Sequence, residues 1–560
     1  MMNINNPSPG AGPSRNELLK QRCPTLAGTI HQTLLDPAKD RFSDDDYEFL
    51  KFHGIYQGDD RDKRKVAKEY IYMVRGRLPG GIVTPAVYLA FDRLCELYSN
   101  STLRITTRQA FQLHGVTKGN LGKLMKGLNE AMITTLAACG DVCRNVMAAP
   151  TPASSPLIDE VQRQAALVSN ALLPKTRAYH QIWVEGQELN LTDAATDFDD
   201  PLYGKTYLPR KFKIAFAIPP VNDVDIMTND CGFVAISENN QLAGYNLTAG
   251  GGMGMSHGNA KTYPRLADLI GFVKPEDVLA TAKAVMALHR DFGDRTNRKH
   301  ARLKYLIEER GLAWFRDELS KRLPDVIEPA RPYQFSRHGD TLGWHQQFDG
   351  NYYLGLFVQS GRIKDSEGYR LKTGLRAVVE QFQPELRLTA SQNVLLVNIK
   401  AEDKEAITSC LAAHGIAVEN QASPVRLNSM ACPALPTCGL ALAESERVLP
   451  KTLSRMETLL AATGLVNEQI IFRMTGCPNG CARPLMAELS LVGRAPGKYQ
   501  LYLGGNATGT RLARLFKENV KLEDLETELR PLFEQFARDR HETERFGDFW
   551  QRAAKTEAVS

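Results

Sequence analysis

The feature that most constrains the fold of this chain is a strand–helix–strand pattern that occurs twice. A helix is predicted at 84–100, with a proline in its first turn, and the alternating residues "LRITTRQAFQLHGV" at 103–116 predict a strand after it. The same order returns between residues 351 and 399, where Arg387 and Thr389 correspond to Arg104 and Thr106. Two copies of one unit at a fixed separation predict an internal duplication.

The two copies differ in their polar residues. Arg108 and His114 of the first copy stand opposite Ser391 and Val397 of the second. A face that only meets water gives no reason for this loss of charge, whereas a bound anion does. The first copy is therefore predicted to bind an anion that the second does not.

A chain of 560 residues exceeds the size of a single hydrophobic core, so several packing units are expected. The first 45 residues are polar and lack sustained periodicity, which predicts an extended tail. Glycine-rich loops at 248–265 and 501–511 extend the duplication to two larger α/β units, and 522–540 reads as an amphipathic helix. The expected segments are the tail at 1–50, a half-domain with its lead-in at 51–136, a larger unit at 137–333, a second half-domain at 334–415 and a second larger unit at 416–560.

The N-terminus has no apolar segment of the kind that a signal peptide needs, and no apolar run reaches the length of a membrane span. A cytoplasmic protein without membrane contact is therefore expected. Ten cysteines do not make a disulfide scaffold in a chain of this length, so clustered thiols are predicted to be metal ligands or catalytic groups.

Four cysteines form such a cluster. Cys477 and Cys481 lie in "RMTGCPNGCARP" at 473–484, and Cys432 and Cys438 lie in "SMACPALPTCGLA" at 429–441. Each pair sits in a loop with proline and glycine, which predicts a four-thiolate site. Zinc remains an alternative, but the wide spacing of the first pair favours a [4Fe–4S] cluster. The other six cysteines read as small buried residues.

Basic residues form a second group. Arg75, Arg144, Arg210, Lys211 and Lys213, with Arg104 and Arg108, occur in short stretches that contain no acid. Unpaired cations beside strands predict a bound polyanion. The net charge of +5 is too small to indicate nucleic acid, and these stretches lack the interleaved aromatic residues of a nucleic-acid surface. A small anionic ligand in a cleft is the preferred interpretation.

These motifs, "SMACPALPTC", "TGCPNGC" and "YLPRKFK", closely resemble those of the sirohaem-containing sulfite and nitrite reductase family, and the resemblance covers nearly the whole chain beyond the tail. It implies an α+β fold that is internally duplicated. Two ferredoxin-like half-domains and two larger α/β domains would surround a central cofactor site, with a functional site in one copy and a vestigial site in the other.

The resemblance also implies roles for individual residues. Cys432, Cys438, Cys477 and Cys481 would bind one [4Fe–4S] cluster, and Cys481 would also be the axial ligand of the sirohaem iron. The substrate-binding residues implied are Arg75, Arg144, Lys211 and Lys213. The cofactor contacts implied are Arg104, Thr106, Arg108, Gln112, His114, Arg210 and Asn479.

The reaction implied is the six-electron reduction of sulfite to sulfide, in assimilatory sulfate reduction and cysteine biosynthesis. The electrons would come from a flavoprotein subunit that carries FAD and FMN and uses NADPH, with a ferredoxin as the alternative donor. A sirohaem nitrite reductase is the nearest competing function, and a cluster-bearing RNA-binding protein is a competitor of another class.

Overall fold

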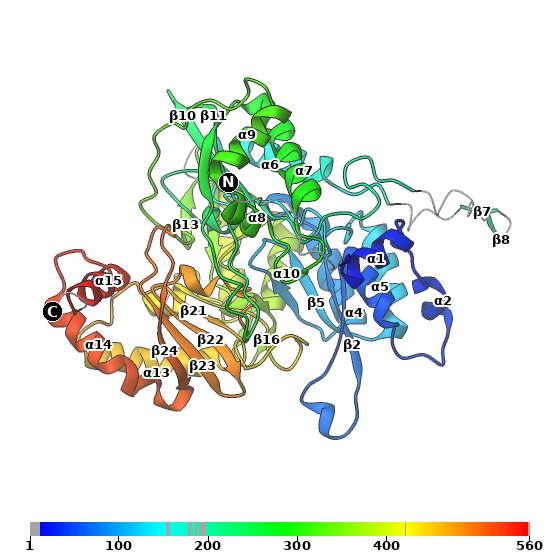
Figure 1. The fold of residues 1–560 in the computed structure, drawn as a ribbon. Coiled ribbons are helices and arrows are strands. Elements are labelled where there is room, and N and C mark those ends of the chain that lie inside the picture. The colour runs from blue at the N-terminus through cyan, green and yellow to red at the C-terminus, as the bar shows by residue number, and fades with distance from the viewer. Residues whose placement is uncertain are drawn as a thin grey trace.

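The computed structural model describes residues 12–152, 157–176, 182–184, 187–189, 198–419 and 422–557. Within them the chain forms four five-stranded sheets with helices packed on them, and two short hairpins (Figure 1). The hairpins are β7 (Ile182–Val184) with β8 (Gln187–Leu189) and β16 (Asp365–Ser366) with β17 (Tyr369–Arg370). This mixture of sheets and helices is the predicted α+β class.

Two of the sheets belong to the repeated strand–helix–strand units. The first contains β1 (Ile55–Asp59), β2 (Tyr70–Arg75), β5 (Phe111–Val116), β4 (Leu103–Ile105) and β15 (Arg362–Ile363). The second contains β13 (Gly343–Gln346), β14 (Tyr352–Leu356), β19 (Val394–Ile399), β18 (Glu385–Leu388) and β3 (Ile82–Val83). Each sheet ends in a short strand from the other unit, because β15 pairs with β4 and β3 pairs with β18. The two units are thus held together by backbone hydrogen bonds.

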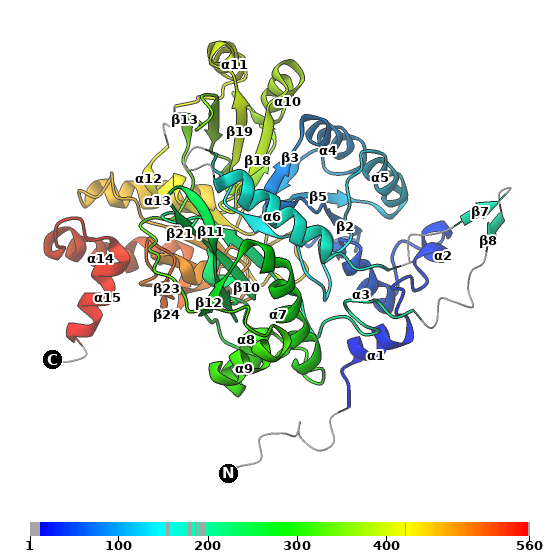
Figure 2. The ribbon, with the colours of Figure 1, turned by 90° about the horizontal axis from the view of Figure 1, so that it is seen from above.

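Helices cover these two sheets. The helices are α4 (Pro85–Tyr98) and α5 (Lys118–Glu130) in the first unit, and α10 (Leu371–Phe382) and α11 (Lys404–Ala412) in the second. Helices α4 and α10 lie side by side (Figure 2), and their apolar residues share one core. The hydroxyl of Thr84 accepts from the backbone N–H of Val87 and caps α4, and Pro85 follows as its first residue, as the sequence predicts.

The two larger sheets have the same topology as each other. One runs β6 (Met147–Ala148), β9 (Ile214–Ala217), β10 (Cys231–Glu238), β11 (Gln241–Ala249) and β12 (Asp268–Val273). The other runs β20 (Ser429–Ala431), β21 (Phe472–Thr475), β22 (Leu489–Ala495), β23 (Lys498–Leu503) and β24 (Arg514–Lys521). In both, the first three strands are parallel and the last two antiparallel. The duplication therefore extends to the larger units.

Separate helices pack on each of these sheets. Those of the first are α6 (Leu157–Ala171), α7 (Val278–Phe292), α8 (Leu303–Arg310) and α9 (Leu312–Arg322). Those of the second are α12 (Pro424–Leu427), α13 (Leu449–Ala462), α14 (Leu525–Asp539) and α15 (Phe546–Glu557). Helix α14 confirms the amphipathic helix expected at 522–540. Among the described residues, no helix combines the length and the apolar character needed to cross a bilayer.

The structure corrects the single strand expected at 103–116. Strands β4 and β5 form a hairpin instead, and residues 106–110 form its loop. The reversal needs a left-handed residue, and Gln109 has φ 50°. Its counterpart Gln392 has φ 74° in the loop between β18 and β19, so the two copies share even this unusual backbone conformation. The polar residues at 106–110 therefore lie on a loop rather than on the face of a strand.

The extended tail expected at 1–50 is also wrong for the residues that the structure describes. This segment forms α1 (Arg15–Arg22), α2 (Ile30–Leu35) and α3 (Asp44–Phe52). Helix α3 begins where the hydroxyl of Ser43 accepts from the backbone N–H of Asp46, and three aspartates occupy its first turn, where the helix dipole favours them. Leu19, Leu26 and Phe49 join the core of the first larger unit. A few well-spaced apolar residues thus outweigh the polar composition; residues 1–11 lie outside the described residues.

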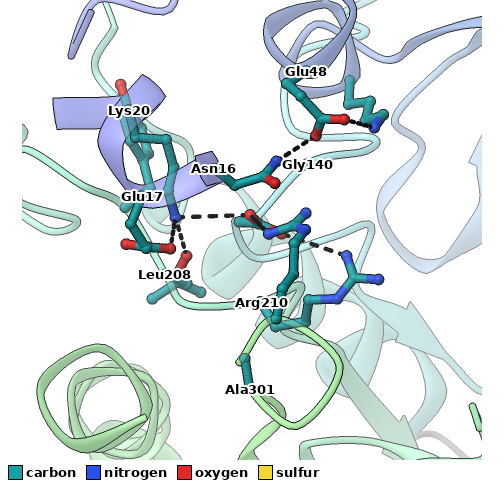
Figure 3. Close-up of polar contacts among 12 residues, drawn as sticks. Asn16, Glu17, Lys20, Glu48, Gly140, Leu208, Arg210 and Ala301 are labelled. Carbon is teal, nitrogen blue, oxygen red and sulfur yellow. Dashed lines mark hydrogen bonds and ion pairs between the residues drawn. The ribbon is translucent and has the colours of Figure 1, made fainter. Parts of the chain in front are cut away.

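Helix α1 places a buried cation beside loops that carry predicted site residues (Figure 3). The ammonium group of Lys20 pairs with Glu17, donates to the carbonyl oxygen of Leu208 at 2.8 Å and lies 3.7 Å from Asp141 Oδ2. Asp141 also pairs with Arg298, at 2.6 Å, and with Arg210, at 3.6 Å. Although burial opposes it, these cations hold the pKa of Asp141 below its usual range.

Replacing Lys20 by methionine is expected to destabilise the protein, because it leaves Glu17 and Asp141 with less compensating charge. Loss of one partner from a buried ion pair costs about 3–5 kcal/mol, so the apparent melting temperature should fall by several degrees. The matched control is Lys39→Met, since Lys39 is exposed and its pair with Asp36 lies on the surface. Equal melting temperatures for the two variants would show that the buried ion pairs of Lys20 do not stabilise the fold.

Candidate active site

The two cysteine loops meet because they follow neighbouring parallel strands. Strand β20 ends at Ala431, directly before Cys432, and β21 ends at Thr475, two residues before Cys477. Strands β20 and β21 are parallel, so both loops leave the same edge of the sheet. The backbone N–H of Gly476 donates to Cys432 Sγ at 3.3 Å, and the side-chain amide of Asn479 donates to Cys477 Sγ at 3.5 Å.

The four thiols influence one another. Burial, reinforced by Cys481, raises the pKa of Cys477 to about 12 and raises those of Cys432 and Cys438 as well. Cys432, Cys438 and Cys477 therefore stay protonated unless a cation displaces their protons. No group of three or more Cys, His, Asp or Glu side chains in the described residues is placed to share a single metal ion. Structural zinc needs all four ligands around one ion, whereas a cubane cluster spreads its four thiolates over several irons.

Cys481 differs from the other three thiols in its surroundings. It is exposed, whereas Cys432 and Cys477 are buried and Cys438 is half-buried. Its carbonyl oxygen accepts a hydrogen bond from Thr107 Oγ1 at 2.9 Å, which ties it to the β4–β5 loop. Cys481 also lies within electrostatic range of Arg75 and Lys211. Cys481 thus interacts electrostatically both with the other thiols and with two of the predicted substrate-binding cations.

Those cations come from three segments of the first copy. Arg75 ends β2, Arg144 precedes β6, and Lys211 and Lys213 precede β9. Arg75 Nη1 and Arg144 Nη1 both donate to the carbonyl oxygen of Ala138, at 3.5 and 3.1 Å. The structure therefore gathers side chains that are far apart in the sequence.

The charge of this group is not balanced. Within the described part of the chain, no ion pair with a carboxylate involves Arg75, Arg108, Arg144, Lys211 or Lys213. Burial, reinforced by Arg210, Arg302 and Arg144, lowers the pKa of Lys211 to about 7. Burial also lowers the pKa of Lys213 well below its ordinary value and that of Arg108 to about 9. Of these five cations Arg144 is buried and the other four are half-buried. Partly desolvated cations without counter-ions are the condition that an anionic ligand relieves.

The predicted cofactor contacts divide into two sets. Arg108 donates to Asn229 Oδ1 at 2.8 Å and to two backbone carbonyls, and its Nε is buried without a partner among the described residues. Its backbone N–H donates to Thr106 Oγ1 at 3.2 Å. Gln112, with its amide oxygen turned toward Arg75, accepts from Arg75 Nε at 3.1 Å. These three residues face the region of the unpaired cations.

The other set has protein partners. Arg104 donates to Glu446 at 2.9 Å and to the carbonyl oxygen of Ala431 at 2.8 Å, directly before Cys432. His114 Nδ1 lies 3.3 Å from Arg362 Nη1, and Arg362 also pairs with Glu446. Arg104 and His114 thus belong to a network behind the first cysteine loop, and Arg210 is paired with Asp141.

Known proteins similar to this chain identify its family. The family model described as "Nitrite/Sulfite reductase ferredoxin-like half domain" matches residues 64–131 and 345–414, and "Nitrite and sulphite reductase 4Fe-4S domain" matches residues 164–327. A curated protein of Myxococcus xanthus, named sulfite reductase [NADPH] hemoprotein beta-component, is 50% identical over 546 residues, 96% of each chain. A protein of the same name from Geobacillus kaustophilus is 46% identical over 559 residues, 99% of this chain and 98% of that protein. The chain belongs to the nitrite and sulphite reductase family.

The solved structure of Mycobacterium tuberculosis NirA agrees with the fold of this family member, with a TM-score of 0.79, 22% identity and coverage of 98% and 99% of the two chains. The match to the 4Fe-4S domain model lies in the first larger unit, so the four cysteines fall outside the matched residues.

The second larger unit provides a comparison for the cations of the first. Strand register shows which residues of the two sheets are equivalent. Met147 on the first strand of one sheet pairs with Ala215, and Met430 on the first strand of the other pairs with Arg473. Strand β9 therefore corresponds to β21, and Ala215 to Arg473. Buried acids follow the same equivalence: the backbone N–H of Lys213 donates to Asp230 at 2.9 Å, and that of Ile471 donates to Glu488 at 3.0 Å. Lys213 therefore corresponds to Ile471, and Lys211 to Gln469.

The equivalent place in the second copy is a cavity of about 450 Å³. Its lining includes the neutral counterparts of four cations: Ser391 for Arg108, Leu427 for Arg144, Gln469 for Lys211 and Ile471 for Lys213. The lining also contains Arg337, Arg473 and Arg545, which come from other positions. The four cations Arg108, Arg144, Lys211 and Lys213 are thus specific to the first copy, which is the pattern expected of one functional and one vestigial site.

The residues present fit the cofactors of the family. Four thiols within electrostatic range of one another, with N–H donors aimed at two of them, suit a [4Fe–4S] cluster. The unpaired cations and the orphaned Nε of Arg108 suit the carboxylates of sirohaem. Sequence reasoning missed the acids Glu446 and Asp230 and the cation Arg362, because ion-pair partners from distant segments carry no local pattern.

Proposed function

We propose that this chain is the haemoprotein subunit of an NADPH-dependent sulfite reductase. It would reduce sulfite to sulfide and water with six electrons and six protons. The observation that carries the proposal is the group of five cations without carboxylate partners. Arg75 and Lys211 of this group lie within electrostatic range of Cys481, and four of the five have neutral counterparts in the second copy. The names of relatives that match nearly the full chain support the same reaction.

Cys432, Cys438, Cys477 and Cys481 would hold the cluster, and Cys481, the exposed thiol of the four, would also bind the sirohaem iron. When bound, the cluster and the sirohaem supply electrons one at a time and an iron centre for the sulfur of sulfite. Asn479 donates to Cys477 Sγ, and such hydrogen bonds adjust the potential of a cluster.

Arg75, Arg144, Lys211 and Lys213 would bind the sulfite anion. Sulfite is largely dianionic near neutral pH, so it compensates charge that the protein leaves unbalanced. Because the pKa of Lys211 is lowered to about 7, its ammonium group is poised to donate a proton to an oxygen that leaves as water. Arg75 and Arg144 share the carbonyl oxygen of Ala138, which fixes the direction of both guanidinium groups.

The haem contacts would come from Thr106, Arg108 and Gln112, with Arg210 at the edge. Arg108 has the strongest case, because its Nε lacks a partner among the described residues. Arg104 would act through its ion pair with Glu446, and His114 through Arg362, which pairs with the same acid. Both residues would support the loop of Cys432 and would not contact the macrocycle directly.

The partner would be a flavoprotein subunit with FAD and FMN. NADPH delivers a two-electron hydride, whereas a cluster accepts single electrons, so a flavin must lie between them. Assimilatory sulfate reduction in the cytoplasm is the setting proposed for the pair.

The test is to purify the full chain and measure iron, acid-labile sulfide and zinc, followed by turnover with reduced methyl viologen. Iron with a haem spectrum, and a higher kcat/KM for sulfite than for nitrite, are the results expected. Zinc without iron would contradict the cluster. A higher kcat/KM for nitrite would make the chain a nitrite reductase instead.

A further inference from the structure

The fully buried Asp225 has no role in the active site proposed above. Asp225 follows the cis Pro219–Pro220 segment of the first larger unit, and its backbone is left-handed, with φ 46°. Its side chain is 0% exposed. Its carboxylate pairs with Arg473, at 2.7 Å, and with Arg483. These are the two arginines that flank the second cysteine loop.

Arg483 connects this acid to both half-domains. Its Nη1 donates to the carbonyl oxygen of Thr107 at 2.8 Å, and its Nη2 donates to that of Ala390 at 2.8 Å. Thr107 and Ala390 are equivalent positions in the loops of the two hairpins. One guanidinium group therefore bridges the two copies at the point where the cysteine loop ends.

The same contacts reach Cys481. Thr107 Oγ1 donates to the carbonyl oxygen of Cys481 at 2.9 Å, so Asp225, Arg483, Thr107 and Cys481 form a continuous chain of contacts. Arg473 reinforces it, because its Nη1 also donates to the carbonyl oxygen of Arg483 at 3.0 Å. His338 closes the group, with its Nε2 2.8 Å from Arg473 Nη2 and 3.1 Å from Asp225 Oδ1.

We propose that Asp225 is a positioning residue that fixes Cys481 against the Thr107 loop through Arg473 and Arg483. The inference rests on the proposed role of Cys481 as the ligand shared by the two cofactors. The physical reason is charge: without the carboxylate, two buried guanidinium groups face each other uncompensated, and each must move away. Arg483 then releases Thr107, and the backbone of Cys481 loses its fixed distance from the loop that carries Arg108.

The decisive experiment compares Asp225→Asn with Asp223→Asn in the full chain at pH 7. Asp223 is a matched control because it is also buried and lies two residues away. Burial, reinforced by Asp340, raises the pKa of Asp223 to about 8, so this carboxyl is largely neutral and its replacement by asparagine removes little charge. The measurements are iron per chain, the visible spectrum, the cluster midpoint potential, and kcat and KM for sulfite with reduced methyl viologen.

Asp225→Asn should shift the haem absorption bands and the cluster potential and lower kcat tenfold to a hundredfold, the range typical of outer partners of metal ligands. KM for sulfite should stay unchanged, since Arg75, Arg144, Lys211 and Lys213 keep their contacts. Asp223→Asn should match the wild type in all four measurements. A spectrum, potential and kcat per haem equal to the wild type, with only a lower melting temperature, would overturn the proposal.

A milder variant keeps the proposal testable if Asp225→Asn does not yield loaded protein. Thr107→Val removes only the hydroxyl that reaches Cys481, so it should shift the bands in the same direction at an unchanged melting temperature. A wild-type spectrum for Thr107→Val would refute the link to Cys481. Absence of iron or of a haem spectrum in the wild type would instead refute the proposed function, so the two failures are distinguishable.

Discussion

Replacing Cys481 by serine is expected to abolish sulfite reduction and to change the haem spectrum together with the cluster content. The reason is position: Cys481 is the exposed thiol of the four, and it lies within electrostatic range of both the other thiols and the cations Arg75 and Lys211. Loss of an outer partner of a metal ligand already costs about 10- to 100-fold, so loss of a ligand shared by two centres should exceed that range.

The measurement is kcat with reduced methyl viologen, with the visible spectrum and the iron content of the same samples. The matched control is Cys410→Ser, because Cys410 lies on α11, away from the cysteine loops, and should leave all three unchanged. A variant at Cys481 that loses cluster iron but keeps the wild-type haem bands would show that the thiolate serves one centre only.

Lys211→Met is expected to lower kcat/KM for sulfite by about a hundredfold or more and to remove one limb of the pH profile. General-acid groups contribute about 10²- to 10⁴-fold. The pKa of Lys211 is lowered to about 7, so the ammonium form predominates below pH 7 and is lost as pH rises. Because kcat/KM reports the free enzyme and the free substrate, the wild type should lose activity above about pH 7, and the variant should lack this decline apart from the part that the titration of sulfite contributes to both proteins.

The matched control is Gln469→Met, which changes the equivalent residue of the second copy. It should leave kcat/KM and its pH dependence as in the wild type. If Lys211→Met lowered the rate but kept the decline above pH 7, the titrating group would be a different one, and Lys211 would act only through its charge.

Much of this protein follows from local sequence patterns. The spacing of Arg104 and Arg387 indicates the duplication, and the structure extends it to the left-handed Gln109 and Gln392. Sequence resemblance indicates the family, and the comparisons confirm it. Both succeed because periodicity, turn residues and cysteine loops are properties of short segments, in which the backbone alone sets which side chains are neighbours.

Other features depended on the tertiary structure. The sequence by itself determined that Arg104, Arg473 and Arg483 are cations without acids nearby in the chain. Only the fold decided that Glu446 and Asp225 pair with them, across hundreds of residues, and that Lys20 is buried beside Asp141. The physical reason is that a buried charge needs a partner in space, and no local pattern records which distant segment supplies it.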